Sequence, residues 1–130
     1  MTDHYLRSAI YARVASKQQA KQHAISSQIQ AVKQRILDDG LEYDSELVFV
    51  DDGHSGNSLD RPGLQRLRDQ AAAGAIDRLY VLSPDRLSRD CAHHALLVEE
   101  LALGGAEVIF LDNPRGRHLE DILPREVDRP

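Results

Sequence analysis

Four short apolar runs alternate along the chain with segments whose apolar residues recur at helical spacing. The runs are suited to buried strands and cover residues 9–14, 47–50, 79–82 and 108–111. Between them, apolar positions three or four residues apart predict helices over 26–39, 62–73 and 92–103. This strict alternation predicts an α/β fold: an open, mainly parallel sheet of four or more strands with helices on both faces.

Residues that begin and end helices stand at the expected places. Ser26 or Ser27 is expected to cap the first helix, and Gly40 to end it. Pro62 suits the first turn of the second helix, and Gly74 is expected to end it.

The periodic pattern fails after residue 111. Residues 112–130 hold three of the five prolines, mixed charges and little periodicity apart from a short helical turn around 119–123. A chain of 130 residues has the length of one domain. We therefore expect one folded domain over residues 1–112 and an irregular tail over residues 113–130.

Composition excludes several protein classes. Apolar residues make up 42% and charged residues 28%, as in ordinary globular proteins. No run approaches the ~18 apolar residues of a membrane helix, and the polar start lacks the apolar region of a secretory signal. The single cysteine, Cys91, cannot form an internal disulfide or a zinc cluster. We expect a cytoplasmic protein without metal or cofactor and without membrane contact.

The charge balance is acidic, with 16 Lys+Arg against 21 Asp+Glu and a net charge of −5. Taken alone, this balance disfavours a dedicated nucleic-acid-binding domain. However, 13 of the 16 cations are arginine, whose planar guanidinium can form two parallel hydrogen bonds to one phosphate group. Genomic base composition explains the same preference, so the positions of the arginines matter more than their number.

Arginines stand in all three segments that follow a predicted strand. Loops at the carboxyl ends of parallel strands meet at one edge of the sheet, which here unites residues 13–19, 51–61 and 83–89. The cations brought together are Arg13, Arg61, Arg86 and Arg89. A bound phosphate would relieve their mutual repulsion. Alternatively, each pairs with a local acid: Arg86 with Asp90, and Arg61 with Asp60.

Other candidate sites are weaker. Neither a dinucleotide-binding glycine motif nor a P-loop motif is present. His93 and His94 are adjacent and diverge by about 100° on a helix, which favours a solvated face over a joint metal site. Cys91 is interpreted as a small buried residue.

Three motifs resemble those of the serine recombinases, the group that includes resolvases, invertases, large serine integrases and transposases. The first is Tyr11-Ala12-Arg13-Val14, followed by Gln19 and Gln28. The second is Asp52-Gly53-x-Ser55-Gly56 with Asp60-Arg61-Pro62-x-Leu64, and the third is Asp85-Arg86-Leu87-x-Arg89. The resemblance runs from about residue 8 to 114 and is closest to the large serine recombinase and transposon-resolvase branch.

The resemblance implies an enzyme that cleaves and rejoins DNA without a metal or nucleotide. In that family a serine attacks the phosphodiester, forms a 5′-phosphoserine link and frees a 3′-hydroxyl. By resemblance, Arg13, Arg86 and Arg89 bind the scissile phosphate, and Asp85 is a candidate proton donor to the leaving oxygen. The residues expected to support phosphate or DNA binding are Arg61, Ser55, Gln19, Gln28 and Ser16.

The sequence departs from the family at the nucleophile. The serine that follows the Tyr-Ala-Arg-Val run is replaced by Ala15, which has no oxygen to form the ester. Ser16 is adjacent, but one residue along an extended chain moves ~3.3 Å and reverses the side chain. Because a misplacement of ~1 Å costs ~100-fold in rate, we predict a cleavage-dead site. A deliberate Ser→Ala exchange and a natural remnant both fit.

A second departure concerns the tail. The family continues into a long dimerisation helix and a DNA-binding domain, and residues 113–130 are too short and proline-rich for that helix. The resemblance implies DNA as the partner. Because the helix that forms the dimer is missing from this chain, we expect a dimer or tetramer only for a full-length protein. Two alternatives remain: a non-catalytic regulatory or assembly module, and a flavodoxin-like binder of small molecules that rests on architecture alone.

Overall fold

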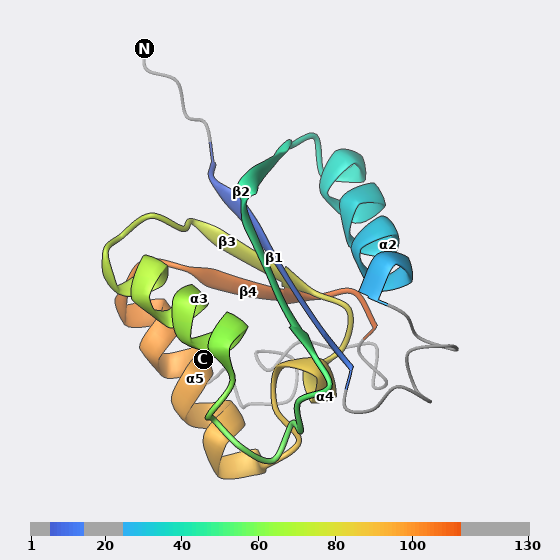
Figure 1. Cartoon of the computed structure of the whole chain (residues 1–130). Coiled ribbons are helices and arrows are strands. Elements are labelled where there is room, and N and C mark those ends of the chain that lie inside the picture. Colours follow the sequence, from blue (N-terminus) through green and yellow to red (C-terminus); the bar gives the residue numbers. More distant parts are fainter. Residues whose placement is uncertain (1–5, 15–24, 113–130) are drawn as a thin grey trace, which may run out of the picture.

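The computed structural model describes residues 6–14 and 25–112, whose arrangement is shown in Figure 1. Positions 15, 16 and 19 and the tail 113–130 therefore lie outside the described residues. The strands are β1 (Ser8–Val14), β2 (Tyr43–Asp52), β3 (Arg78–Val81) and β4 (Glu107–Phe110). They form one sheet in the order β2-β1-β3-β4 in which every pair is parallel. The predicted α/β class is confirmed.

Helices cover both faces of this sheet (Figure 1). Helix α2 (Ile25–Asp38) lies on one face, and α3 (Pro62–Ala72) and α5 (Cys91–Leu103) lie on the other. A single helical turn, α4 (Pro84–Leu87), follows β3 at the edge where the strands end. Among the described residues, no helix has the length and apolar character to cross a membrane.

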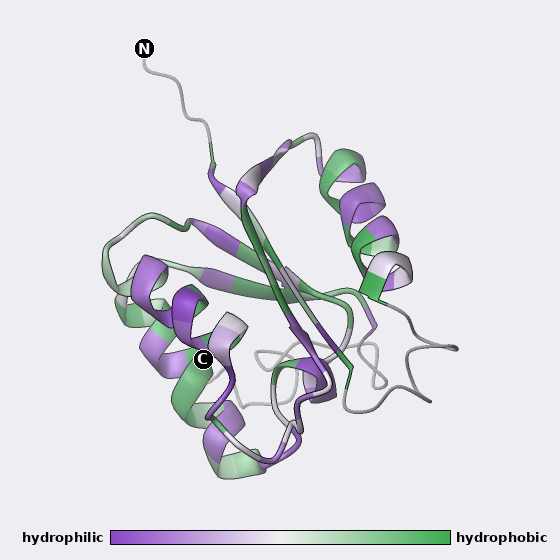
Figure 2. Cartoon of the chain, viewed as in Figure 1, coloured by the Kyte–Doolittle hydropathy of each residue, from purple (hydrophilic) through white to green (hydrophobic). Residues whose placement is uncertain are grey.

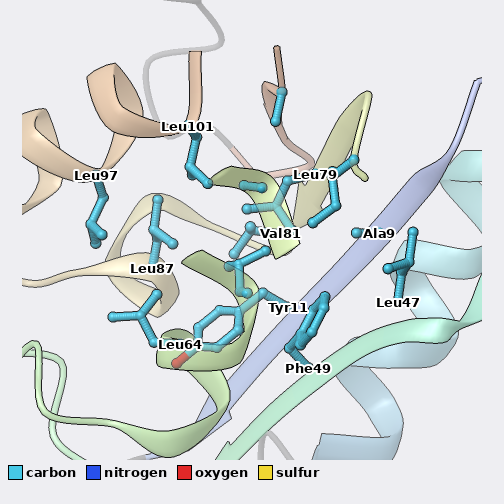
Figure 3. Close-up of a cluster of buried hydrophobic side chains, with 14 residues drawn as sticks. Ala9, Tyr11, Leu47, Phe49, Leu64, Leu79, Val81, Leu87, Leu97 and Leu101 are labelled. Carbon is cyan, nitrogen blue, oxygen red and sulfur yellow. The ribbon is translucent and has the colours of Figure 1, made fainter. Parts of the chain in front are cut away.

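The alternation of side chains along β1 divides the core in two. Ala9 and Tyr11 join the larger cluster beneath α3 and α5, which includes Leu64 and Leu97 (Figure 3). Ile10 points to the opposite face and packs with residues of α2. Figure 2 shows apolar residues along the middle of the strands, so the sheet is buried on both sides.

Two details differ from the sequence-based expectations, and one agrees with them. Helix α2 begins at Ile25, so Ser26 and Ser27 are exposed residues of its first turn and do not cap it. The helical pattern of inward positions extends back to Ile25, which explains the earlier start. Strand β2 begins at Tyr43, four residues before the apolar run. Gly40 follows α2 with a φ of 80°, a conformation that favours glycine, as expected for a helix end.

Candidate functional site

Arg13 lies at the centre of the edge where the strands end. Its side chain is almost fully buried, and every hydrogen bond that its guanidinium donates within the described residues goes to a backbone carbonyl. Nε donates to the Arg86 carbonyl at 2.9 Å, Nη1 to that of His54 at 2.9 Å and Nη2 to that of Asp85 at 2.7 Å. One side chain from β1 thus joins the loop after β2 to helix α4 after β3.

The backbone of β1 is fixed at the same place. The N–H of Arg13 donates to Oε1 of Gln28 at 3.2 Å, and Nε2 of Gln28 donates to the Arg13 carbonyl at 2.9 Å. The next carbonyl, of Val14, accepts from the N–H groups of Gly53 at 2.8 Å and His54 at 3.1 Å. The strand is therefore held on both sides immediately before position 15. Gln28, expected to contact phosphate or DNA, is buried and binds the backbone of Arg13.

Arg61 is a second buried arginine that binds neutral groups. Nε donates to the Ser58 carbonyl at 2.8 Å, Nη2 to the Leu87 carbonyl at 2.7 Å and Nη1 to the Tyr11 hydroxyl at 2.9 Å. Burial raises the pKa of the Tyr11 hydroxyl, against the opposing charge of Arg61 and with a contribution from Asp51. The hydroxyl therefore stays protonated and donates to Asp51 Oδ2 at 2.7 Å.

Asp51 is a buried acid at the strand ends that the sequence did not single out. Its buried carboxylate accepts from the N–H groups of Gly63 at 2.7 Å and Leu64 at 2.8 Å, at the start of α3. A helix N-terminus has free N–H groups and a partial positive charge, so a carboxylate stabilises it. Gly63 is required for this approach, because a Cβ there would lie 2.5 Å from the Val50 carbonyl oxygen. The sequence signal for this role was an aspartate near the end of an apolar strand, just before the loop that leads to α3.

Arg86 and Arg89 retain unused hydrogen-bond donors. Arg86 is half-buried and donates from Nη1 to the Arg13 carbonyl at 3.2 Å, while its buried Nε has no partner among the described residues. Arg89 is exposed, and its guanidinium forms no hydrogen bond or ion pair within the described part of the chain. Its backbone N–H donates to the Gly56 carbonyl at 2.9 Å.

The side chains of Asp85 and Ser55 form hydrogen bonds with residues two positions away in the sequence. Burial raises the pKa of the Asp85 carboxyl, but a hydrogen bond from Ser83 at 2.6 Å and the charges of Arg86 and Arg13 outweigh it, so the pKa is lowered overall. Asp85 is therefore ionised at neutral pH, which disfavours it as a proton donor in the DNA-free protein. The Ser55 hydroxyl, on an exposed loop, accepts from the N–H of Asn57 at 3.0 Å.

The predicted local ion pairs are not found between residues that the structure describes. Arg61 binds carbonyls and Tyr11 rather than Asp60, and Asp90 accepts from the N–H of His93 at 3.0 Å as the cap of α5. Burial lowers the pKa of Arg13, and the positive charges of Arg61 and Arg86 add to this effect. Arg61 and Arg86 therefore lie near enough to Arg13 for their charges to act on it. Arg13 and Arg61 are buried and bind protein groups, and the expectation that a phosphate rests among the four arginines stays a prediction.

Cys91 and the histidine pair also differ from expectation. Cys91 is exposed, because the first residue of α5 lies off the stripe of Leu97 and Leu101 that faces the core. His93 and His94 are half-buried, and the His94 ring stacks on Phe110 at a centroid distance of 5.6 Å. Within the described ranges, no group of His, Cys, Asp or Glu side chains is arranged to hold a metal ion.

Sequence comparisons relate the chain to recombinases. Residues 8–124 match the family model described as resolvase, N terminal domain. A putative DNA recombinase of Bacillus subtilis (strain 168) is 39% identical over 106 residues, which cover 80% of this chain and 20% of that protein. The transposon Tn3 resolvase of Escherichia coli is 37% identical over 103 residues, covering 79% of this chain and 49% of the resolvase. The chain therefore spans between a fifth and half of the length of these relatives.

Solved structures agree with this relationship. The N-terminal catalytic domain of TP901-1 integrase superposes with a TM-score of 0.74 at 31% identity, covering 81% of this chain and 77% of that one. A serine recombinase from Sulfolobus solfataricus superposes with a TM-score of 0.70 at 25% identity, covering 90% and 74%. Both similarities extend over most of the chain.

Proposed function

Since this chain belongs to the resolvase N-terminal domain family, the catalytic-domain family of serine recombinases, we propose that it is the catalytic domain of a site-specific DNA recombinase. A full-length protein of this kind cleaves and rejoins DNA through a 5′-phosphoserine link. Its partners are DNA and further copies of itself, which form a dimer and then a tetramer. Residues 1–112 form the catalytic domain, and it works in the cytoplasm.

The observation that carries this proposal is the set of unused arginine donors at the strand ends. The buried Nε of Arg86 and the exposed guanidinium of Arg89 lack partners among the described residues, and buried Arg13 and Arg61 add positive charge behind them. Phosphodiester oxygens accept charge-assisted hydrogen bonds from such groups. Guanidinium groups held in place before the reaction also stabilise the charge that develops during phosphoryl transfer.

Asp85 fits its proposed role only when DNA is bound. In the free protein, positive neighbours keep its carboxyl ionised. A phosphate anion beside the same arginines acts in the opposite direction, because a nearby negative charge raises the pKa of a carboxyl group. Asp85 then gains a proton that it can pass to the leaving oxygen.

Ala15 makes the chain inactive in strand cleavage as it stands. It directly follows Val14, whose carbonyl is held by two hydrogen bonds at the arginine cluster. The methyl group of alanine cannot form a phosphoester, so the pocket lacks its attacking atom. This substitution also favours a second candidate function, a regulatory module that joins recombinase assemblies without cleaving.

A chimera tests the proposal. Residues 1–112 replace the matching half of the Tn3 resolvase, with Ala15→Ser introduced, and covalent adducts with that resolvase's DNA site are counted on denaturing gels. We expect an adduct that disappears when Arg86→Gln and Arg89→Gln are added. Arg66→Gln, at an exposed arginine of α3, serves as the matched control and should leave the adduct unchanged. A chimera that binds DNA and assembles but never forms an adduct favours the regulatory module.

A further inference from the structure

Asp51 is a buried acid that has no cation bound directly to it. The residue is 2% exposed, and its Oδ1 accepts from the Gly63 N–H at 2.7 Å. Its Oδ2 accepts from the Leu64 N–H at 2.8 Å and from the Tyr11 hydroxyl at 2.7 Å. Between residues that the structure describes, Asp51 forms no ion pair. Two of its three bonds serve the start of α3, whereas the bond to Tyr11 leads elsewhere.

The Tyr11 hydroxyl connects this carboxylate to Arg61. A phenol has one proton to donate and lone pairs with which to accept. Because a carboxylate accepts and a guanidinium only donates, the hydroxyl gives its proton to Asp51 and accepts from Arg61 Nη1, 2.9 Å away. The guanidinium carbon of Arg61 also lies 5.9 Å from the centre of the Tyr11 ring. The two outer groups therefore fix the direction of both hydrogen bonds.

Arg61 extends this chain of hydrogen bonds to α4. Its Nη2 donates to the carbonyl of Leu87, the last residue of α4, at 2.7 Å. The four residues joined in this way are each at most 2% exposed, so the bonds are shielded from water. A single helical turn is not stable by itself, because starting a helix costs more than one hydrogen bond returns. The position of α4 therefore depends on contacts such as this one.

Helix α4 carries part of the proposed anion site. Arg86 is one of its four residues, and Arg89 stands two positions after its end. A displacement of the Leu87 carbonyl would therefore move the backbone that bears both arginines.

We infer that Asp51 and Tyr11 are positioning residues of the proposed anion site, because they hold Arg61 and Arg61 holds the end of α4. The inference rests on the proposed function for the identity of the anion. Tyr11→Phe isolates this role, since it keeps the aromatic ring in the core and both bonds from Asp51 to the N–H groups of α3. It removes only the hydroxyl between the carboxylate and the guanidinium.

Tyr80→Phe is the matched control. Its hydroxyl also joins an aspartate to an arginine, Asp39 to Arg78, but on the opposite face of the sheet. Both variants lose one tyrosine hydroxyl, and only Tyr11→Phe interrupts the bonds that lead to α4.

The first test measures binding of inorganic phosphate to the ¹⁵N-labelled chain through the backbone amide signals of Arg86 and Arg89. We expect Tyr11→Phe to weaken phosphate binding about tenfold, as when an anion loses one charge-assisted hydrogen bond. Tyr80→Phe should bind phosphate like the parent chain. Equal losses in the two variants would overturn the positioning role, because they would follow from loss of a hydroxyl anywhere in the fold.

The second test needs no phosphate. Because phenylalanine keeps the ring, changes in the amide signals around α4 report the loss of the hydroxyl. The Ser88 N–H donates to the Pro84 carbonyl at 3.1 Å, so its signal follows the end of α4. We expect the Ser88 and Arg89 signals to shift in Tyr11→Phe and to keep their positions in Tyr80→Phe. Unshifted signals in Tyr11→Phe would overturn the inference.

The part of Asp51 is tested in two backgrounds. Asp51→Asn leaves one acceptor oxygen for three donors, so it should weaken phosphate binding in the parent chain. In Tyr11→Phe, where the chain of bonds is already broken, it should lower stability but cause no further loss of phosphate binding. A second loss of equal size would show that Asp51 acts on the site by another route. Unchanged binding in the parent background would show that its carboxylate is not needed.

The two proposals fail in different ways. If phosphate shifts no signal in the parent chain, the anion pocket of the proposed function is wrong. The α4 signals of Tyr11→Phe then still decide whether the hydroxyl holds that turn in place. If phosphate binds the parent chain and Tyr11→Phe equally well, the pocket stands and the positioning role is wrong.

Discussion

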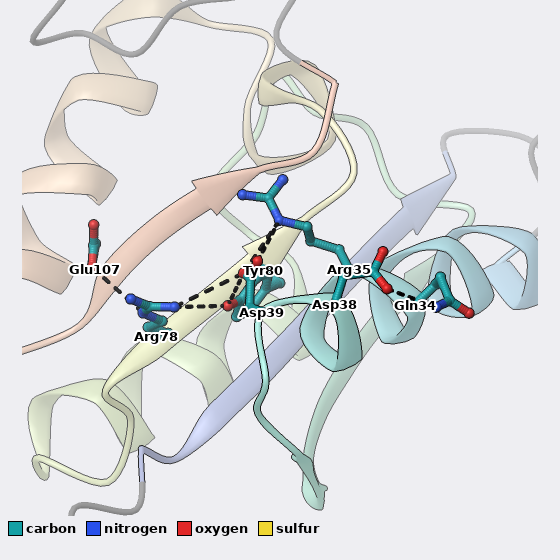
Figure 4. A network of polar contacts seen from close by, with 7 residues as sticks. All are labelled: Gln34, Arg35, Asp38, Asp39, Arg78, Tyr80 and Glu107. Carbon is teal, nitrogen blue, oxygen red and sulfur yellow. Dashed lines mark hydrogen bonds and ion pairs between the residues drawn. The ribbon is translucent and has the colours of Figure 1, made fainter.

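The hydroxyl of Tyr11 donates to Oδ2 of Asp51 at 2.7 Å, and this buried contact joins the central strand to the start of α3. A matching arrangement occurs on the other face of the sheet (Figure 4). There the Tyr80 hydroxyl donates to Asp39 Oδ2 at 2.7 Å and accepts from Arg78 Nη1 at 3.0 Å. Both tyrosines link an arginine to an aspartate. The acid and arginine are buried in the first case and more accessible in the second.

This pair of arrangements allows a matched stability comparison. Tyr11→Phe should lower the free energy of unfolding by about 1–3 kcal/mol, because buried Asp51 and Arg61 each lose a partner. Tyr80→Phe should cost about 0.5–1.5 kcal/mol, since water can replace the hydroxyl beside Asp39 and Arg78. Urea unfolding followed by circular dichroism measures both. Equal losses, or a larger loss for Tyr80→Phe, would show that burial does not set the strength of these contacts.

Gly56→Ala should disrupt the arginine site through steric conflict. The new methyl group would lie 2.6 Å from Arg13 Nη2, so Arg13 and Arg89 must both shift. We expect a loss of about 1–3 kcal/mol in stability, typical of overpacking, together with loss of phosphate binding. Gly40→Ala is the control: it has open space but a φ of 80°, so it should lower stability without affecting phosphate. Intact phosphate binding by Gly56→Ala would contradict the close packing described here.

His94 should make stability depend on pH below neutrality. Burial against Phe110 lowers the pKa of the His94 imidazole, so the folded state favours the neutral ring. Its contribution is fully present above the unfolded pKa of about 6.5 and is lost as the pH falls below that value toward the folded pKa.

His94→Phe should keep the ring stack and remove this part of the pH dependence. Urea unfolding at pH 7.5 and at pH 5.5 gives the comparison, with the parent chain losing more stability than the variant on acidification. Parallel losses in the two proteins would mean that other groups cause the effect.

The parallel strands and the three long helices were predictable because burial imposes a period on the sequence. Helix α4 was missed because four residues are too few to show periodicity, and Ser83-Pro84 reads as a turn. The site was predictable only in part. Sequence placed Arg13, Arg61, Arg86 and Arg89 at one edge of the sheet. The structure links that edge through hydrogen bonds from the Arg13 and Arg61 side chains to carbonyls of α4 and from the Arg89 N–H to Gly56.

Sequence did not show where those side chains point. The partners of Arg13 and Gln28 are backbone groups, and no residue type marks a backbone carbonyl that will become an acceptor. Asp51 was missed for the same reason, because its partners are N–H groups of a helix that begins eleven residues later. Residue identity predicted the chemistry available at the site, whereas tertiary packing decided which groups remain free to bind a ligand.

The most direct test of the central claim compares two forms of the resolvase chimera that differ only at position 15. Both are incubated with the resolvase's DNA site and stopped with denaturant, and protein covalently attached to a 5′ end is measured. The form with alanine should bind the site and give no adduct, whereas Ala15→Ser should give one. A covalent adduct formed by the alanine form would contradict the account, because another residue would then be the nucleophile.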